Sequence, residues 1–161
     1  MRKYAMVPAL VAAIAAVWVW TASAIDGPRT LTLIEVSIPK NDRALGDFSF
    51  ERPPASGDRF VVTNALTSES KRVGHVKVFH TFVTGFGPRF DRKATVLFVA
   101  QAYVPGGSLL AEGYGQVSAD GPTKLSIPVL GGTGSYANVR GELKVRTLSQ
   151  NKTRLEFRLL P

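Results

Sequence analysis

Cysteine is absent from the 161-residue sequence, and histidine occurs only twice. The absence of cysteine excludes disulfide bonds, thiol catalysis, a cysteine-linked lipid anchor and cysteine-ligated metal. His75 and His80 fall on one expected strand at an odd spacing, so their side chains point to opposite faces and cannot share a metal ion. We therefore expect no metal and no other cofactor.

Acidic residues are scarce, with 12 Asp and Glu against 20 Lys and Arg, which gives a net charge of +8. Such an excess of positive charge permits contact with an acidic surface. The basic residues are spread along the chain and alternate with apolar ones, as on a solvated strand exterior. We therefore expect no nucleic-acid partner.

Long apolar runs are missing except at the N-terminus. Arg2 and Lys3 precede an apolar run over residues 5–20, and the small-x-small sequence "ASA" follows at 22–24. This pattern is typical of a signal peptide over residues 1–24, since the run is short for a membrane span. It predicts a secreted or extracytoplasmic protein with one domain over 25–161. The alternative is a retained anchor, through which residues 5–20 associate with a membrane.

Helical periodicity is also missing after residue 24, where apolar and polar residues alternate instead. The alternation predicts eight strands, at 30–38, 58–66, 73–84, 94–104, 108–117, 123–130, 139–148 and 153–160. Residues 39–57 are rich in turn-forming residues and predict a long loop, a candidate lid over one barrel mouth.

The alternation also predicts how the strands pack. The last two strands are apolar on one face and charged on the other, which indicates half-buried antiparallel strands. Because no helices are available to cover a sheet, we expect an all-β fold, an eight-stranded antiparallel β-barrel with room for one small ligand.

Three polar residues interrupt the apolar face of this barrel. Glu35 shares a strand face with Leu31 and Leu33, Asn64 falls among apolar residues of the second strand, and His80 does so in the third. A carboxyl group in an apolar lumen has a raised pKa, which suits acid–base chemistry. The alternatives are an inverted first strand, a bulge at Asn64 and a structural core histidine at His80.

A glycine-rich stretch, "GGTGSYANVRGE" (131–142), raises the question of phosphate binding. A phosphate-binding loop requires a following helix and usually a "GK[ST]" ending, but an alternating strand pattern follows here. The glycines therefore predict a tight turn into the next strand, with positive φ angles that glycine adopts without steric cost.

This stretch resembles the shared barrel of allene oxide cyclases and dirigent proteins. Three further segments resemble the same barrel in the same order: "GDRFVVTNAL" (57–66), "KRVG" (71–74), taken as a turn, and "GSLLAEGYGQV" (107–117). The resemblance covers the chain from Thr30 onward. It implies the barrel fold, a small hydrophobic substrate and a homotrimer.

The resemblance also implies site residues. The family's first-strand carboxylate falls on Glu35, the amide two residues later on Ser37, and the amide that holds a water and a substrate oxygen on Asn64. The family's lumen cysteine falls on His80, whereas its Ser-Pro step has no counterpart in "KNDRALGD" (40–47). The catalytic candidates are therefore Glu35, Asn64 and His80. The substrate-binding candidates, which include lumen-facing neighbours of these residues, are Ser37, Phe60, Val62, Val78 and Phe82.

Together these patterns favour a cofactor-independent isomerase or cyclase. It would steer cyclisation or isomerisation of a hydrophobic substrate of oxylipin, phenolic or polyketide type, supplying much of the rate by orientation. Two alternatives stay open, a non-catalytic carrier of hydrophobic ligands and a cell-envelope binding module whose lumen is filled by its own side chains.

Overall fold

The computed structural model describes residues 27–87, 93–118 and 124–161. These residues form nine strands and one short 3-10 helix, η1 (Pro39–Asn41). The strands are β1 (Arg29–Val36), β2 (Arg43–Leu45), β3 (Arg59–Ser68), β4 (Lys71–Phe82), β5 (Ala94–Val104), β6 (Gly107–Val117), β7 (Lys124–Gly134), β8 (Arg140–Ser149) and β9 (Lys152–Leu160). The expected signal peptide at 1–24 and the start of the expected strand at Thr123 lie outside the described residues.

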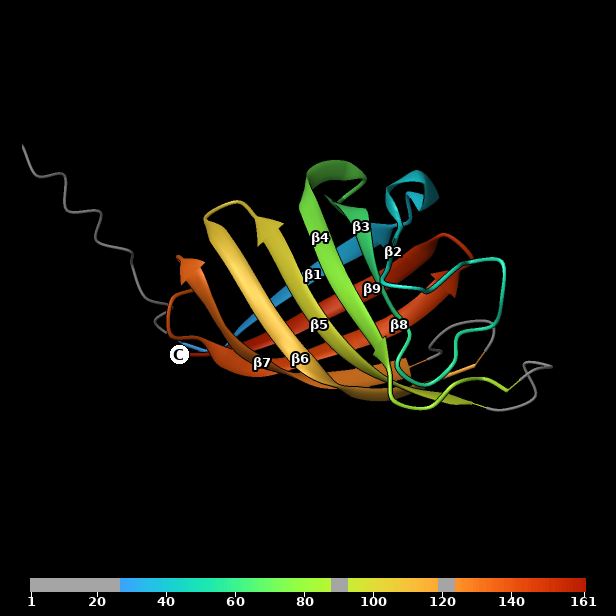
Figure 1. Ribbon diagram of the computed structural model, residues 1–161. Coiled ribbons are helices and arrows are strands. Elements are labelled where there is room, and N and C mark those ends of the chain that lie inside the picture. The colour runs from blue at the N-terminus through green and yellow to red at the C-terminus, as the bar shows by residue number, and fades with distance from the viewer. Residues whose placement is uncertain (1–26, 88–92, 119–123) are drawn as a thin grey trace, which may run out of the picture.

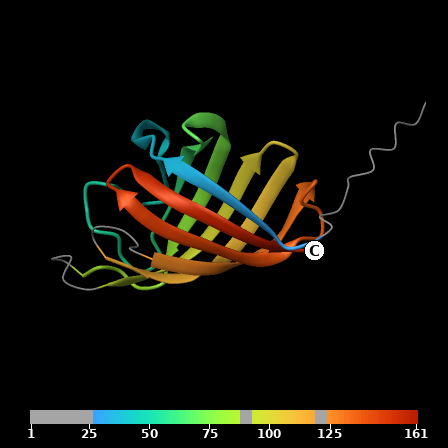
Figure 2. The same ribbon diagram turned by 180° about the vertical axis from the view of Figure 1, so that it is seen from behind.

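The strands form one antiparallel sheet in the order β1-β9-β8-β7-β6-β5-β4-β3-β2, and β1 also pairs with β3. This last pairing, at Ile34↔Thr67 to Val36↔Ala65, closes eight of the strands into a barrel and leaves β2 as an addition at its edge. Figures 1 and 2 show β3–β6 on one side of the barrel and β1, β8 and β9 on the other. The predicted eight-stranded antiparallel barrel is confirmed.

The segment 39–57 contains more regular structure than expected. It holds η1 and then β2, which pairs with β3 from Arg43↔Val61 to Leu45↔Arg59. The turn-forming residues of this segment concealed a three-residue strand, because so short a strand has almost no alternation to detect. The predicted long loop therefore contains two three-residue elements that its sequence did not indicate.

The expected glycine turn was placed too early, although Gly134 has the expected positive φ, of 61°. Residues 131–134 complete β7, pairing with β6 from Gly107↔Gly134 to Leu110↔Gly131, and the chain turns at 135–138 instead. A glycine is required at position 132 because a Cβ there would collide with the carbonyl oxygen of Ser108 on the paired strand. The glycines thus serve a close approach of two backbones. Likewise "KRVG" begins β4, and the turn before it is formed by Glu69 and Ser70, with φ of 48° and 67°.

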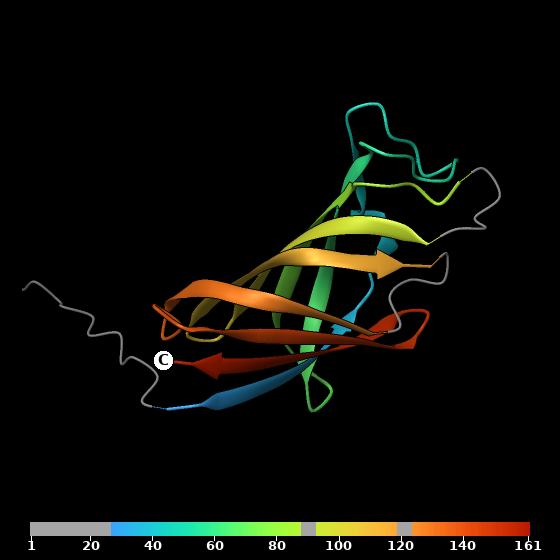
Figure 3. The ribbon, with the colours of Figure 1, turned by 90° about the horizontal axis from the view of Figure 1, so that it is seen from below.

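The wall between β6 and β7 is only partly hydrogen-bonded. Their ladder runs from Gly107↔Gly134 to Ala111↔Val129, and beyond it the two strands diverge (Figure 3). Side chains fill the gap, since Ile127 approaches the backbone of Gly113 and Leu125 that of Gly115. We call this region the β6–β7 seam.

The interior of the barrel is apolar, and Leu33, Leu66, Leu109, Leu143 and Phe157 are almost completely buried in it. The expected inside–outside alternation is confirmed most clearly in β5, where every second residue from Ala94 to Val104 is buried. In the described part of the chain, no helix is long and apolar enough to cross a membrane.

Candidate functional site

A cavity of about 250 Å³ lies inside the barrel. Its walls are mainly apolar and come from β3, β4, β5, β7, β8 and β9, while Glu35 and Ser37 border it at the end of β1. It extends to the β8–β9 turn, where Gln150 and Asn151 line it. The lumen is therefore not completely filled by the protein's own side chains.

Glu35 and Asn64 meet at this cavity through the closure of the barrel. The β1–β3 pairing sets Glu35 opposite Leu66, so Asn64, two residues before Leu66, presents its side chain on the same inner face. The amide Nδ2 of Asn64 donates a hydrogen bond to Glu35 Oε1 at 2.7 Å. Its Oδ1 accepts one from the backbone N–H of Ile38 at 3.0 Å. Asn64 thus connects the carboxyl to the chain that enters η1.

The pKa of Glu35 is raised above its ordinary value, mainly because burial removes water from the carboxylate. The hydrogen bond from Asn64 opposes this effect, and the negative charge of Asp42 adds to it. Burial also raises the pKa of Asp42, whose Oδ1 is buried without a hydrogen-bond partner in the described part of the chain. The protonated form of Glu35 is therefore more favoured than that of an exposed glutamate.

His80 is held as a neutral ring. It stacks on Phe60 at a centroid distance of 4.3 Å and an interplanar angle of 12°, and it meets Phe98 edge-on at 5.2 Å. Burial lowers its pKa to about 4, an effect that the backbone of Val78 partly opposes. Its Nδ1 is buried and has no hydrogen-bond partner among residues 27–87, 93–118 and 124–161. A polar group of a ligand that reached Nδ1 would therefore satisfy a buried atom.

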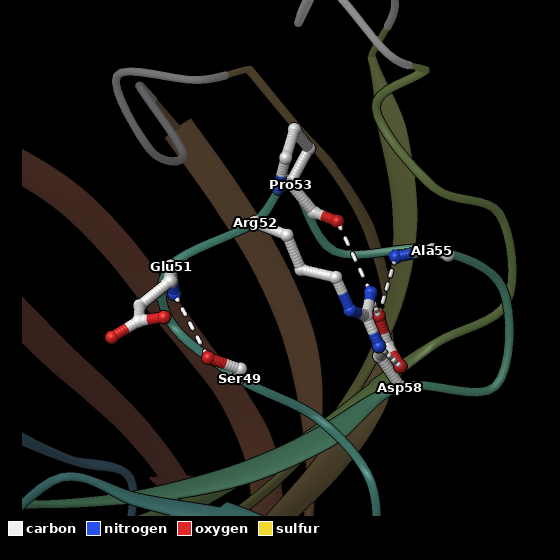
Figure 4. A network of polar contacts seen from close by, with 6 residues as sticks. All are labelled: Ser49, Glu51, Arg52, Pro53, Ala55 and Asp58. Carbon is white, nitrogen blue, oxygen red and sulfur yellow. Dashed lines mark hydrogen bonds and ion pairs between the residues drawn. The ribbon is translucent and has the colours of Figure 1, made fainter.

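The segment between β2 and β3 covers the aromatic side of the site. Phe48 stacks on Phe60 at 5.6 Å, and Phe50 meets both rings edge-on at 5.0 and 5.5 Å. Figure 4 shows how the segment is fastened, with the Arg52 guanidinium bound to Asp58 by two contacts of 2.5 and 2.8 Å. Asp58 also accepts a bond from the Ala55 N–H at 2.6 Å. We call residues 46–58 the aromatic lid.

Seven of the eight predicted site residues line this one cavity. They are Glu35, Ser37, Phe60, Val62, Asn64, Val78 and His80. Phe82 does not line it, and its ring packs between Phe60 at 5.9 Å and Phe86 at 5.7 Å. Asn64 pairs regularly with Val76 and does not form the bulge considered above. The catalytic roles of these residues stay predictions.

Sequence reasoning missed four polar residues near the site. Thr153, Gln150 and Asn151 line the cavity, and Asp42 acts on Glu35 through its charge. Thr153 lies opposite Glu35 in the β1–β9 register, so a correct strand pairing would have found it. The others lie in turns or irregular chain, where periodicity gives no direction for a side chain.

Fold and site together define a small antiparallel barrel with a ligand-sized, mostly apolar cavity that contains a buried acid. Solved structures with this architecture include a pyocyanin demethylase, with a TM-score of 0.63 and 21% identity over 81% of this chain and 99% of that one. The pterocarpan synthase dirigent protein PsPTS1 has a TM-score of 0.63 and 18% identity, over 83% of this chain and 94% of that one. The exo-specific intermolecular Diels-Alderase AbnU has a TM-score of 0.60 and 12% identity, over 82% of this chain and 97% of that one.

The chain therefore has the allene oxide cyclase/dirigent-like barrel fold, which confirms the resemblance at the level of fold. No protein-family model matches the sequence, and no curated protein matches it.

Proposed function

We propose that the barrel binds a small hydrophobic molecule in its cavity and steers a cyclisation or isomerisation of that molecule. The observation that carries the proposal is the Glu35 carboxyl, which is held by Asn64 at 2.7 Å, borders an apolar cavity and has a raised pKa. Barrels of the same fold carry the names Diels-Alderase and pterocarpan synthase, and these names support a ring-forming reaction.

The cavity limits the size of the substrate. An apolar cavity of about 150 Å³ can hold one benzene ring, so the 250 Å³ here suits a molecule of roughly two rings, or a folded chain of similar volume. The walls contribute mainly shape, and a substrate that fits them is held in the conformation that reacts. This size favours phenolic or small polyketide substrates over a long oxylipin chain lying wholly inside the cavity.

Glu35 would act as a general acid. Its hydrogen bond from Asn64 is the only one that the described residues give this carboxyl, so the second oxygen remains for a substrate atom. In the protonated form it can donate to a carbonyl or hydroxyl oxygen of the substrate as electron density develops there. In the ionised form it can take that proton back or stabilise a developing positive charge.

Asn64 and His80 would assist in different ways. Both polar ends of Asn64 are engaged, one by Glu35 and one by Ile38, so its main task is to orient the carboxyl. His80 is neutral, and the unpartnered Nδ1 supports a hydrogen bond to a polar group of the substrate. The stack on Phe60 fixes the plane of the imidazole.

The test begins with the ligand that copurifies with the full chain. Native mass spectrometry and chiral chromatography identify the molecule recovered from the cavity, and its open-chain precursor is then incubated with wild type and Glu35→Gln. We expect both proteins to bind the precursor and the variant to form the ring on the order of a hundredfold more slowly. Equal rates for the two proteins would remove Glu35 from the reaction.

The non-catalytic carrier remains the second candidate, since an apolar cavity by itself supports it. A carrier releases the same molecule that it binds, so the recovered compound and the added compound would be identical in structure and stereochemistry. In that outcome the proposed reaction is wrong even if binding is tight.

A further inference from the structure

The outer face of β7, β8 and β9 carries most of the excess positive charge of the barrel. Alternate residues of these strands point outward, and we call this surface the basic face. Its cations are Lys124, Arg140, Lys144, Arg146, Lys152, Arg154 and Arg158, and its anions are Glu142 and Glu156. Figure 2 shows β8 and β9 on the near side of the barrel, beside β1.

Three of these cations form a row across neighbouring strands. Lys124 pairs directly with Arg146, and Arg146 pairs directly with Arg154. Like charges at directly opposite positions destabilise a sheet, so the row opposes folding in the absence of an anion. The charge arrangement is therefore not explained by the stability of the barrel.

Carboxylates of the basic face neutralise this row only at one end. Glu156 lies 3.6 Å from Arg154 and 2.7 Å from Arg158, while Glu142 lies 3.4 Å from Lys144. Within the described residues, Lys124 and Arg146 form no ion pair. The free charge is therefore concentrated at the β7 side of the row.

The same residues surround a shallow depression in the outer wall. Five cations border it, Lys124, Lys144, Arg146, Arg154 and Arg158, together with Ser126 and one carboxylate, Glu156, and Leu125 and Val145 form its apolar part. Leu125 and Val145 also line the internal cavity, so the depression lies behind the cavity wall. A cationic rim around an apolar floor fits a molecule with an anionic head and an apolar body.

We propose that the basic face docks on anionic phospholipid. A sheet face that carries seven cations over three neighbouring strands matches a plane of headgroups better than it matches one small anion. The apolar run at 5–20 precedes β1, which pairs along its whole length with β9, the edge of the basic face. In the retained-anchor alternative, the short apolar segment and the polybasic surface are each weak membrane signals that together give stable association, and in the cleaved protein the basic face acts alone.

Docking in this way has a consequence for the cavity. The barrel lies on its side, so Leu125, Val145 and the β6–β7 seam are close to the lipid. A hydrophobic ligand dissolved in the membrane then reaches the cavity wall without crossing water. This inference concerns the surface and does not depend on whether the cavity is catalytic.

The experiment measures binding of the full chain to vesicles of phosphatidylcholine and to vesicles in which part of it is replaced by phosphatidylglycerol. The ratio of the two partition constants cancels the contribution of residues 5–20, which act in both. We expect a clear preference for the anionic vesicles that weakens at high salt. K124Q/R146Q/R154Q should reduce this ratio on the order of a hundredfold, because each basic side chain near an anionic surface contributes about a factor of five to ten.

The matched control removes three exposed cations from the other side of the barrel, in R43Q/R59Q/K77Q. This variant has the same net charge as the test variant and should keep most of the preference, and circular dichroism checks that both fold. An equal loss in the two variants would mean that net charge alone is responsible, and the proposal is then wrong. It is also overturned if wild type shows no lipid preference, or if duplex DNA is bound through the three residues while vesicles are not.

Discussion

Asn64 donates a hydrogen bond to Glu35 at 2.7 Å across the line where the first strand closes the barrel. The two residues are far apart in sequence and lie on different strands, β1 and β3, and only their pairing brings an amide to the carboxyl. The same amide accepts a bond from Ile38, so the closure of the barrel, the acid and the start of η1 form one connected unit.

The Asn64→Leu substitution removes both hydrogen bonds at nearly constant volume. It leaves the Ile38 N–H and a Glu35 oxygen without partners, and each unsatisfied buried group costs about 1–3 kcal/mol, so we expect a loss of roughly 2–5 kcal/mol in the free energy of unfolding. Denaturant unfolding measures the loss, and the amide of Ile38 should exchange faster. Thr63→Val, on the outer face of the same strand, should change stability by less than about 0.5 kcal/mol. Unaltered exchange at Ile38 in Asn64→Leu would contradict the proposed connection.

The Glu35→Gln substitution should stabilise the protein at neutral pH. Because the pKa of Glu35 is raised in the folded state, its contribution favours folding at low pH and is lost as the pH rises from the unfolded value of 4.5 through the folded value. Glutamine cannot ionise, and its oxygen can still accept the bond from Asn64. The stability difference between variant and wild type should therefore grow with pH above 4.5 and disappear below it. A difference that is constant over this range would show that Glu35 is not perturbed.

The His80 imidazole should titrate with a midpoint near pH 4, where its pKa lies because of burial. The unfolded chain takes up this proton near 6.5, so stability should fall between pH 6.5 and about 4, by up to about 3 kcal/mol from this residue. NMR can follow the ring directly, since the chain has only two histidines and a His75→Gln variant assigns the signals. His80→Phe, which can keep the stack on Phe60, should remove this part of the pH dependence.

The β6–β7 seam should respond to added volume. A methyl group on Gly115 would collide with Cδ1 of Leu125, which must then move into the cavity that it lines. We expect Gly115→Ala to cost about 1–3 kcal/mol and to reduce binding of an apolar probe such as xenon. Adding Leu125→Ala should restore probe binding, whereas Gly27→Ala, with no atom within 4 Å of its Cβ, should change neither quantity. Unreduced xenon binding in Gly115→Ala would show that Leu125 does not control the cavity.

The homotrimer that the resemblance implies would need an apolar contact surface, and the outer face of β4–β6 is the candidate for it. Phe79 and Tyr114 lie on it and are 44% and 64% exposed, and Val83 follows β4 at 46%. Phe79→Glu should convert the assembly into monomers in light scattering coupled to size-exclusion chromatography. Leu148→Glu changes a leucine that is 50% exposed on β8 and should leave the assembly intact. A wild-type protein that is already monomeric would exclude the trimer.

The predicted strands agree with the structure wherever alternation is long. The predicted bounds of β5 and β6 match the structure almost to the residue, because β5 alternates between buried and accessible positions over its whole length and β6 does so over most of it. The bounds predicted from the sequence are wrong where a strand is very short or rich in glycine. The β2 strand is too short to alternate, and residues 131–134 contain glycines that suit a close strand pairing as well as a turn.

Part of the candidate site could also be predicted from the alternation of residues along the strands. Strand phase alone indicates that Glu35, Asn64 and His80 point inward, because side chains on a strand alternate between two faces. It does not indicate that Glu35 and Asn64 touch, that Phe82 packs behind Phe60, or that Asp42 acts on Glu35. Those relations depend on strand register and on the path of irregular chain.

The amino-acid sequence carries the local pattern: no cysteine chemistry, an all-β alternation, and three polar residues on the apolar faces of their strands. Which of these residues meet depends on the folded barrel. The closure of β1 on β3 joins Asn64 to Glu35, and the β7–β8–β9 register brings Lys124, Arg146 and Arg154 into one row. The physical reason is that alternation is a property of one strand, whereas register is set by the balance of packing and hydrogen bonding over the whole barrel.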